Sequence, residues 1–251
     1  MTITRREYGK GHSYYVDCVK FDGVTSLISK GLPKPALPYW SARTVAEYVA
    51  DNLDTVAAMR DMGRASIVAA LKEVPWTART AAAAKGTEVH ALAEKLVAGV
   101  EVDVPEHLAG HVESYVKFLD EWKIEPLLVE ATVAHRKWRY CGTLDLVGRM
   151  PNGRIALMDV KTSASGVFPE TGYQLAAYRH AEVYVDRAGN EPPMTDLDIE
   201  AGYAIWVRAD GYDVLPVKCD EAVFKDFLHI AWTARAVERN KDLVGEAISH
   251  D

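Results

Sequence analysis

Two aspartates and a lysine stand close together between Tyr140 and Tyr178. Asp145 lies in the first of two apolar stretches, and Asp159 and Lys161 lie in the second. A Pro-Asn-Gly turn joins the two stretches, which predicts a β-hairpin followed by a helix. Carboxylates that bind a divalent cation beside an ammonium group are suited to hydrolysis of a phosphodiester.

The length of the turn decides whether the two carboxylates meet. A three-residue Pro-Asn-Gly loop places Asp145 directly opposite Asp159, with side chains about 5 Å apart on one face. A two-residue Asn-Gly loop would instead pair Asp145 with Val160. Strand alternation also puts Lys161 on the face of Asp159. We expect the three-residue loop, because it gathers the charges.

Opposed carboxylates in an apolar strand pair are costly unless a positive charge lies between them. Mg²⁺ or Mn²⁺, one ion or two, would supply that charge, since both ions take oxygen ligands. Lys161 would then hold or deprotonate a water and stabilise a developing anion. The alternative is an Asp159–Lys161 ion pair at a sheet edge. The expected position of Asp145 favours the catalytic interpretation.

These segments resemble the PD-(D/E)xK nuclease superfamily, in its RecB-like exonuclease branch. The resemblance covers most of residues 86–180 and rests on four motifs whose order and spacing are fairly specific together. The motifs are Lys85-Gly-Thr-Glu-Val-His90, Gly142-x-x-Asp145, Asp159-Val-Lys161 and Gln174-x-x-x-Tyr178. One departure is that Leu144, and not proline, precedes Asp145.

The resemblance implies a restriction-endonuclease-like core around a metal site. Its implied metal ligands are His90, Asp145, Asp159 and the carbonyl of Val160, while Lys161 serves the attacking water. It also implies that Gln174 and Tyr178 line the site or contact the DNA. Some relatives carry an iron–sulfur cluster held by four cysteines. No such cluster is expected here, because the chain has only Cys18, Cys141 and Cys219.

Two glutamates are weaker candidates for the same site. Glu94 follows His90 by one helical turn, so both could face one metal, although a surface His–Glu pair is the simpler interpretation. Glu130 lies in a predicted strand over residues 126–134, and some relatives add an acidic residue from this region. We favour an exposed strand glutamate for Glu130.

Two segments combine basic and aromatic side chains. Residues Arg136, Lys137, Trp138 and Arg139 form the densest basic cluster, which could grip phosphate and stack a base. A solvated turn is an equal alternative. The segment from Lys30 to Trp40 also mixes lysines with aromatic rings, but we favour packing of Trp40 on a core.

Composition describes an ordinary globular chain. Of its 251 residues, 49% are hydrophobic and 26% are charged, and the net charge is −7. DNA binding would therefore need local basic patches. No apolar run approaches the roughly 18 residues that span a membrane, and the amino terminus has no signal core. We expect no membrane contact and a cytoplasmic location. The cytoplasm of a phage-infected host is one such setting.

The expected fold class is α/β (α+β), with a central mixed sheet of about five strands flanked by helices. We predict one nuclease domain over residues 1–251, with a mostly helical elaboration at 1–80 and the core at 81–240. Separate helices are expected at 41–53, 62–73 and 79–97, with Pro75 as a break.

The expected function is a metal-dependent DNA exonuclease of recombination, repair or DNA degradation. Single-stranded DNA or duplex ends would be its partners, with a recombination protein as a further candidate partner. The alternatives are an endonuclease of the same fold and a non-cleaving protein that binds DNA ends. The sequence predicts neither polarity nor oligomeric state.

Overall fold

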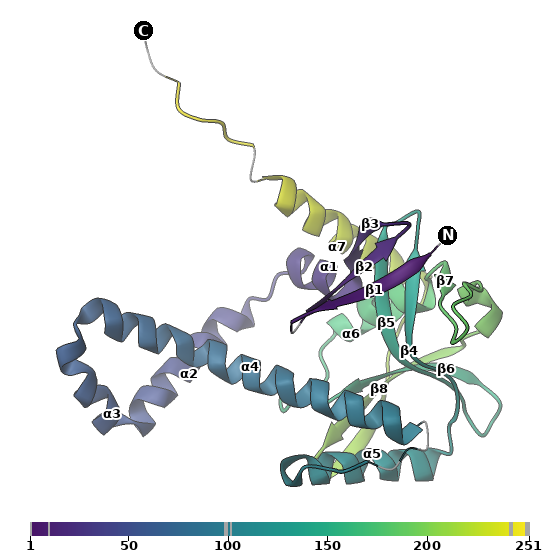
Figure 1. Ribbon diagram of the computed structural model, residues 1–251, viewed down its shortest axis with the longest axis horizontal. Helices are drawn as coiled ribbons and strands as arrows, with labels where there is room; N and C mark the ends of the chain where they lie inside the picture. Colours follow the sequence, from purple (N-terminus) through teal and green to yellow (C-terminus); the bar gives the residue numbers. More distant parts are fainter. Residues whose placement is uncertain (1, 10, 98–99, 101, 241–242, 249–251) are drawn as a thin grey trace. The chain divides into compact units, whose positions relative to one another are not determined.

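The computed structural model describes residues 2–9, 11–97, 100, 102–240 and 243–248. The chain divides into two compact units (Figure 1). The sheet unit consists of Met1–Leu32 and Val89–Asp251, and the helical unit is Pro33–Glu88. The predicted division at residue 80 is therefore corrected at both ends. The first 32 residues belong with the sheet, because they pair as strands with it.

A central mixed sheet of nine strands, flanked by helices, is formed by the described residues, as the expected fold class requires. Its order is β1-β2-β3-β5-β6-β8-β9, while β4 pairs with both β5 and β7. The strands are β1 (Ile3–Tyr8), β2 (Gly11–Val16), β3 (Val19–Gly23), β4 (Glu125–His135), β5 (Tyr140–Arg149), β6 (Ile155–Lys161), β7 (Val183–Tyr184), β8 (Ala201–Arg208) and β9 (Gly211–Pro216). The expectation of about five strands was too low.

The amino-terminal strands explain much of this difference. The largely apolar sequence of residues 13–21 is typical of one strand, but the chain reverses at Asp17 and Cys18, whose φ angles are 48° and 66°. Two consecutive residues with positive φ are typical of a tight hairpin turn. The strands β2 and β3 flank this turn, and β3 continues the sheet by parallel pairing with β5.

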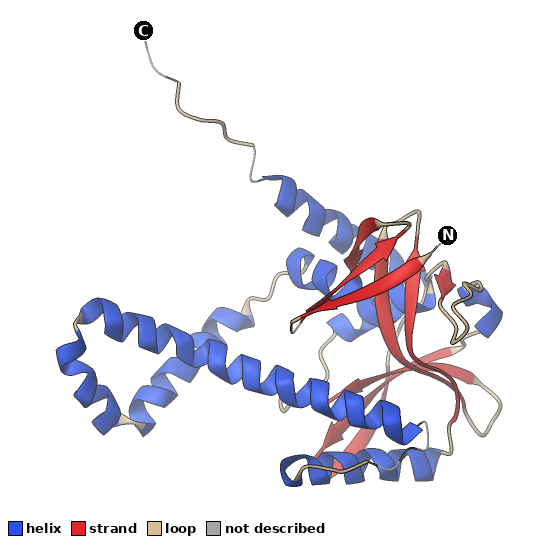
Figure 2. Cartoon of the chain, in the orientation of Figure 1, coloured by secondary structure: helices blue, strands red, loops and turns tan. Residues whose placement is uncertain are grey.

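Helices cover both faces of the sheet (Figure 2). The helices α1 (Val24–Gly31), α6 (Glu170–Arg179) and α7 (Glu221–Arg239) pack around Leu144, Leu157 and Phe227. The helix α5 (Ala109–Trp122) packs against the opposite face through Phe118, beside Leu146 and Met158. Two short 3-10 helices, η2 (Glu106–Leu108) and η3 (Met194–Leu197), complete the unit. The sheet therefore has an apolar core on each side.

The helical unit contains α2 (Ala36–Asp51), α3 (Leu53–Ala58), the 3-10 helix η1 (Met59–Met62) and α4 (Arg64–Val97) as far as Glu88. The predicted break at Pro75 is wrong, because α4 runs through it. A proline removes one helical hydrogen bond, and the alanine-rich sequence around it favours helix strongly enough to offset that loss. None of the described helices is long and apolar enough to cross a bilayer.

Candidate active site

The hairpin between β5 and β6 has the predicted three-residue loop. Met150 donates its backbone N–H to the carbonyl of Arg154 at 2.8 Å, and Gly153 has a φ of 85°. The pairing then runs back to Leu146 opposite Met158. This register is the one that, continued by one residue, sets Asp145 opposite Asp159.

The two strands stop pairing beyond Leu146 and Met158. The side chain of Asp145 replaces the next backbone hydrogen bond. Its Oδ2 accepts the backbone N–H of Val160 at 2.7 Å. A carboxylate thus satisfies a buried donor that the strand ladder leaves free, which fixes the carboxyl group against β6. The structure engages the N–H of Val160; the metal-binding role of its carbonyl stays a prediction.

The neighbouring strand is distorted at the same rung. Glu130 has a φ of 48°, and it is the only described non-glycine residue with positive φ inside a strand. Such a conformation costs about 1–3 kcal/mol, and residues that adopt it cluster at functional sites. Around it, Ala131 pairs with Leu144 on one face of the sheet, whereas Val129 pairs with Leu146 on the other.

The distortion brings Glu130 to Asp145 and His90, so the favoured interpretation as an exposed strand residue is wrong. The side chain of Glu130 is 27% exposed, and His90 Nδ1 lies 3.9 Å from its Oε1 and 3.5 Å from Asp145 Oδ2. Each residue offers a ligand atom, and these atoms lie within 4.8 Å of one another. Glu94 is exposed and outside this group.

Too many negative charges surround one imidazole in this group. Burial disfavours the charged imidazole, but the carboxylates of Asp145, Glu130 and Asp159 outweigh it and raise the pKa of His90 to about 9. Burial, and then the charge of Asp159, raise the pKa of Asp145 to about 7. Without a cation the site would therefore hold protons at neutral pH. An imidazole with carboxylate oxygens is also a donor set that suits Mn²⁺ or Mg²⁺.

A second group of side chains lies beside the first. Lys161 Nζ is 2.6 Å from Asp159 Oδ2 and donates to Gln174 Oε1 at 3.2 Å. Gln174 Nε2 donates to Asp159 Oδ1 at 2.8 Å and to the hydroxyl of Tyr178 at 3.3 Å. The four residues predicted from the β6 and α6 motifs therefore form one connected network.

Asp159 is the buried centre of this network, with 1% of its surface exposed. Its Oδ2 has no hydrogen-bond partner with proper geometry among the described residues, despite the close approach of Lys161. A buried carboxylate oxygen of this kind can accept a further positive ligand. Asp159 nevertheless stands outside the three-residue ligand group, so its metal-binding role stays a prediction.

Lys161 is held in its charged form. Burial favours the neutral amine, but Asp159 and Asp145 outweigh that effect and raise its pKa. At neutral pH it can donate hydrogen bonds and stabilise negative charge, whereas it cannot deprotonate water. Of the two roles expected from the sequence, positioning the water is the one that this protonation state allows.

Gly142, the glycine of the Gly-x-x-Asp motif, has a packing function. A Cβ atom added there would lie 2.3 Å from Cε1 of Tyr178. Only glycine lets the buried ring approach β5 this closely, and the ring hydroxyl in turn contacts Gln174. The motif residues at 142, 174 and 178 thus support one another through contact.

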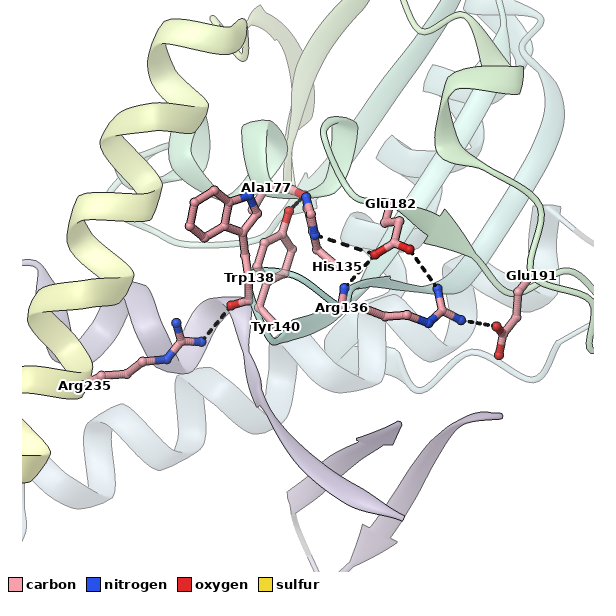
Figure 3. A network of polar contacts seen from close by, with 8 residues as sticks. All are labelled: His135, Arg136, Trp138, Tyr140, Ala177, Glu182, Glu191 and Arg235. Atoms are coloured by element: carbon pink, nitrogen blue, oxygen red, sulfur yellow. Dashed lines mark hydrogen bonds and ion pairs between the residues drawn. The ribbon is translucent and has the colours of Figure 1, made fainter. Parts of the chain in front are cut away.

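The basic cluster at the β4–β5 turn is occupied by contacts within the protein (Figure 3). The guanidinium of Arg136 forms ion pairs with Glu182 and Glu191, and its backbone N–H donates to Glu182 Oε2 at 2.9 Å. Arg235 Nη2 donates to the carbonyl of Trp138 at 3.0 Å. These contacts fix the turn to the rest of the sheet unit.

The other two cations of the cluster lie over aromatic rings. Lys137 Nζ is 5.0 Å from the ring centre of Trp138, and the guanidinium of Arg139 is 5.2 Å from that of Phe21. Trp138 is 37% exposed. Binding of nucleic acid by residues 136–139 stays a prediction, and Arg136 would have to leave two glutamates to take part.

No family model and no curated protein matches the chain. Among solved structures, one titled "Crystal structure of SSO0001" is similar, with a TM-score of 0.33 and 13% sequence identity. The similarity covers 85% of this chain and 74% of that one.

Proposed function

We propose that the protein is a metal-dependent deoxyribonuclease that hydrolyses phosphodiester bonds, working as an exonuclease. The observation that carries the proposal is that one group of side chains, from α4, β4 and β5, lies beside a second group on β6. His90, Glu130 and Asp145 form an acidic ligand group, and Asp159 and Lys161 form a buried ion pair beside it. The four motifs of the RecB-like resemblance supply all of these residues except Glu130.

In this proposal His90, Glu130 and Asp145 would hold one Mg²⁺ or Mn²⁺, and Asp159 would contribute a further carboxylate to that ion or to a second one. A metal bound there supplies charge neutralisation at the phosphate and lowers the pKa of a bound water. The donor set fits this task, because carboxylate oxygens and one imidazole are compatible with both ions. The raised pKa of His90 is further support, since the surrounding carboxylates outweigh the effect of burial. The pKa of Asp145 is raised first by burial and then by the charge of Asp159.

The remaining residues act through position and charge. Lys161 orients a water by hydrogen bonding and stabilises negative charge that develops on the phosphate. Gln174 is a positioning residue, because it bridges Asp159 to Lys161 and holds the ammonium against the carboxylate. Tyr178 supports the amide of Gln174. The preorganised network would spare these groups from reorienting during the reaction.

The test is a cleavage assay with the lysine removed. Lys161→Ala is expected to leave DNA binding nearly unchanged and to lower cleavage about 100- to 1,000-fold, the size expected for a group that stabilises transition-state charge. Lys225→Ala is the matched control, because Lys225 pairs with Glu221 at 2.8 Å on the exposed face of α7. Equal cleavage by the two variants would refute the assignment.

The substrates of the assay separate the proposal from its alternatives. Linear duplex and single strand labelled at the 5′ or 3′ end, and covalently closed circular DNA, are each incubated with Mg²⁺, Mn²⁺ or excess EDTA. Loss of nucleotides from ends, only with metal, supports the exonuclease. Nicking of the closed circle identifies an endonuclease, and binding of ends without cleavage identifies a non-cleaving protein.

A further inference from the structure

The helical unit lacks a core of its own. None of its residues 33–88, all of which the structure describes, is buried. Several large apolar side chains are instead well exposed, including Tyr39 at 80%, Leu53 at 65% and Trp76 at 60%. Exposed apolar side chains that lie close together often mark an interaction site, whereas scattered ones usually do not.

A cavity of about 390 Å³ lies between α2 and α4 within this unit. Leu37, Trp40, Ser41, Ala42 and Val45 line it from α2, and Lys72, Pro75, Trp76 and Arg79 line it from α4. On α4, Lys72, Trp76 and Arg79 are spaced by four and three residues, which places them on one helix face. The expectation that Trp40 packs on a core is wrong, because it faces this cavity in a unit without buried residues.

The chemistry of the lining is specific. It combines two indole rings with two cations, and none of its residues is acidic. The guanidinium of Arg79 lies 5.5 Å from the ring centre of Trp76. Indole faces stack on nucleobases of any sequence, while lysine and arginine neutralise the phosphates between them. A mainly apolar protein partner would meet two desolvated cations here without an acid to pair them.

Charge also distinguishes the helical unit from the whole chain. Residues 33–88 contain seven Lys or Arg and six Asp or Glu, whereas the full chain carries a net charge of −7. The helical unit is thus net positive by one charge, and all of the net negative charge lies in the rest of the chain. A polyanion would therefore be repelled less by the helical unit than by the sheet unit as a whole.

We propose that the cavity between α2 and α4 binds a segment of single-stranded nucleic acid, with bases stacked on Trp40 and Trp76 and phosphates held by Lys72 and Arg79. This inference deepens the proposed nuclease function by naming the form of the strand that the protein holds. It assigns binding to residues that take no part in the four nuclease motifs.

The test measures binding in excess EDTA, where no cleavage occurs. Fluorescence anisotropy of a labelled 20-nucleotide oligo-dT is recorded with the full-length protein. Trp76→Ala is expected to weaken binding about 5- to 100-fold, the range that corresponds to one lost stacking contact. Trp232→Ala on α7 is the matched control, since Trp232 is 66% exposed, and it should change binding less than twofold.

Salt dependence tests the two cations separately. Lys72→Ala and Arg79→Ala should each weaken binding and reduce the slope of log Kd against log salt by about 0.7, the value for one phosphate contact on a single strand. Arg64→Ala provides the control, because Arg64 is exposed on the same helix and does not line the cavity. Circular dichroism of each variant checks that the helices remain folded.

The outcomes are decisive in both directions. Equal binding by the Trp76 and Trp232 variants would overturn the proposal, as would displacement of the oligonucleotide by thymidine monophosphate at matched nucleotide concentration. Self-association of the protein that Trp76→Ala abolishes, without oligo-dT binding, would assign the cavity to a second copy and also overturn it. Binding that survives in Lys161→Ala and is lost in Trp76→Ala supports the inference even if no DNA is cleaved.

Discussion

The β4–β5 hairpin carries one charged cluster at its turn and another at the rung of Glu130 and Asp145, and the two are built in opposite ways. At the turn, the guanidinium of Arg136 meets two glutamates. At the rung, several carboxylates face one imidazole and raise its pKa to about 9. At the turn, the protein itself supplies carboxylates that pair with the cation. Near Glu130 and Asp145, the carboxylates outnumber the positive charge of the imidazole. Charge imbalance, more than charge density, therefore distinguishes a candidate site from a structural clamp.

Of the changes that compare the two clusters, the largest difference is expected when one glutamate is neutralised in each. Glu130→Gln should lower metal-dependent cleavage at least about 100-fold, because it removes a proposed metal ligand, and loss of a residue that only supports a ligand already costs about 10- to 100-fold. Glu182→Gln should keep cleavage within about threefold. Rates measured with labelled linear DNA at fixed Mg²⁺ check both values. Equal loss in the two variants would erase the distinction between the clusters.

Removing the cation of the clamp should affect stability instead of activity. Arg136→Ala leaves the partly buried Glu191 and the more exposed Glu182 without their partner. Because the carboxylate of Glu191 would lose its charge pair in a partly buried place, the change is expected to cost about 1–3 kcal/mol. Arg154→Ala serves as control, because its pair with Glu200 is about half exposed and should contribute less than about 1 kcal/mol. Urea unfolding measures both. Unchanged stability with weakened DNA binding in Arg136→Ala would instead assign the turn to nucleic acid.

The smallest expected effect concerns pH. His90 and Asp145, with pKa values of about 9 and 7, hold protons in the metal-free protein over much of the neutral range. Metal binding must displace them, so affinity for Mn²⁺ should rise with pH from 6 to 8, by up to about tenfold per unit for each proton released. Calorimetric titration in buffers of different ionisation enthalpy would count these protons.

A histidine in the other cluster provides the control for this measurement. Burial, the leading effect, lowers the pKa of His135, and His135→Ala should leave the pH dependence of Mn²⁺ affinity unchanged. An affinity that is flat between pH 6 and 8 in the unaltered protein would contradict the assigned ligands.

Local sequence signals predicted much of the sheet unit. The Pro-Asn-Gly turn determines the β5–β6 register, and the spacing of Gln174 and Tyr178 places both on one helix face. The tight turn at Asp17 and Cys18 was missed, because neither residue is glycine or asparagine and the apolar pattern continues across it. The break predicted at Pro75 was wrong for the opposite reason. Proline is a strong signal for the end of a helix, but the helix-forming residues around it keep α4 continuous.

In the site, too, residues close together in sequence could be predicted, whereas those that the fold brings together could not. Asp159 and Lys161 lie two residues apart on one strand, so alternation alone unites them. Glu130 reaches His90 and Asp145 only through a backbone conformation that its residue type does not predict. Arg136 pairs with two glutamates more than 40 residues away in sequence. Only the spatial structure could show that one predicted bystander belongs to the site and that a basic cluster is neutralised.

The left-handed backbone at Glu130 has a consequence for protein engineering. Glycine adopts that conformation without strain, so Glu130→Gly is a substitution that a screen for thermal endurance would reward. The same substitution deletes a carboxylate from the proposed catalytic centre. Directed evolution for heat resistance would therefore be drawn toward an inactive protein at this position, and any such campaign needs a parallel selection for activity.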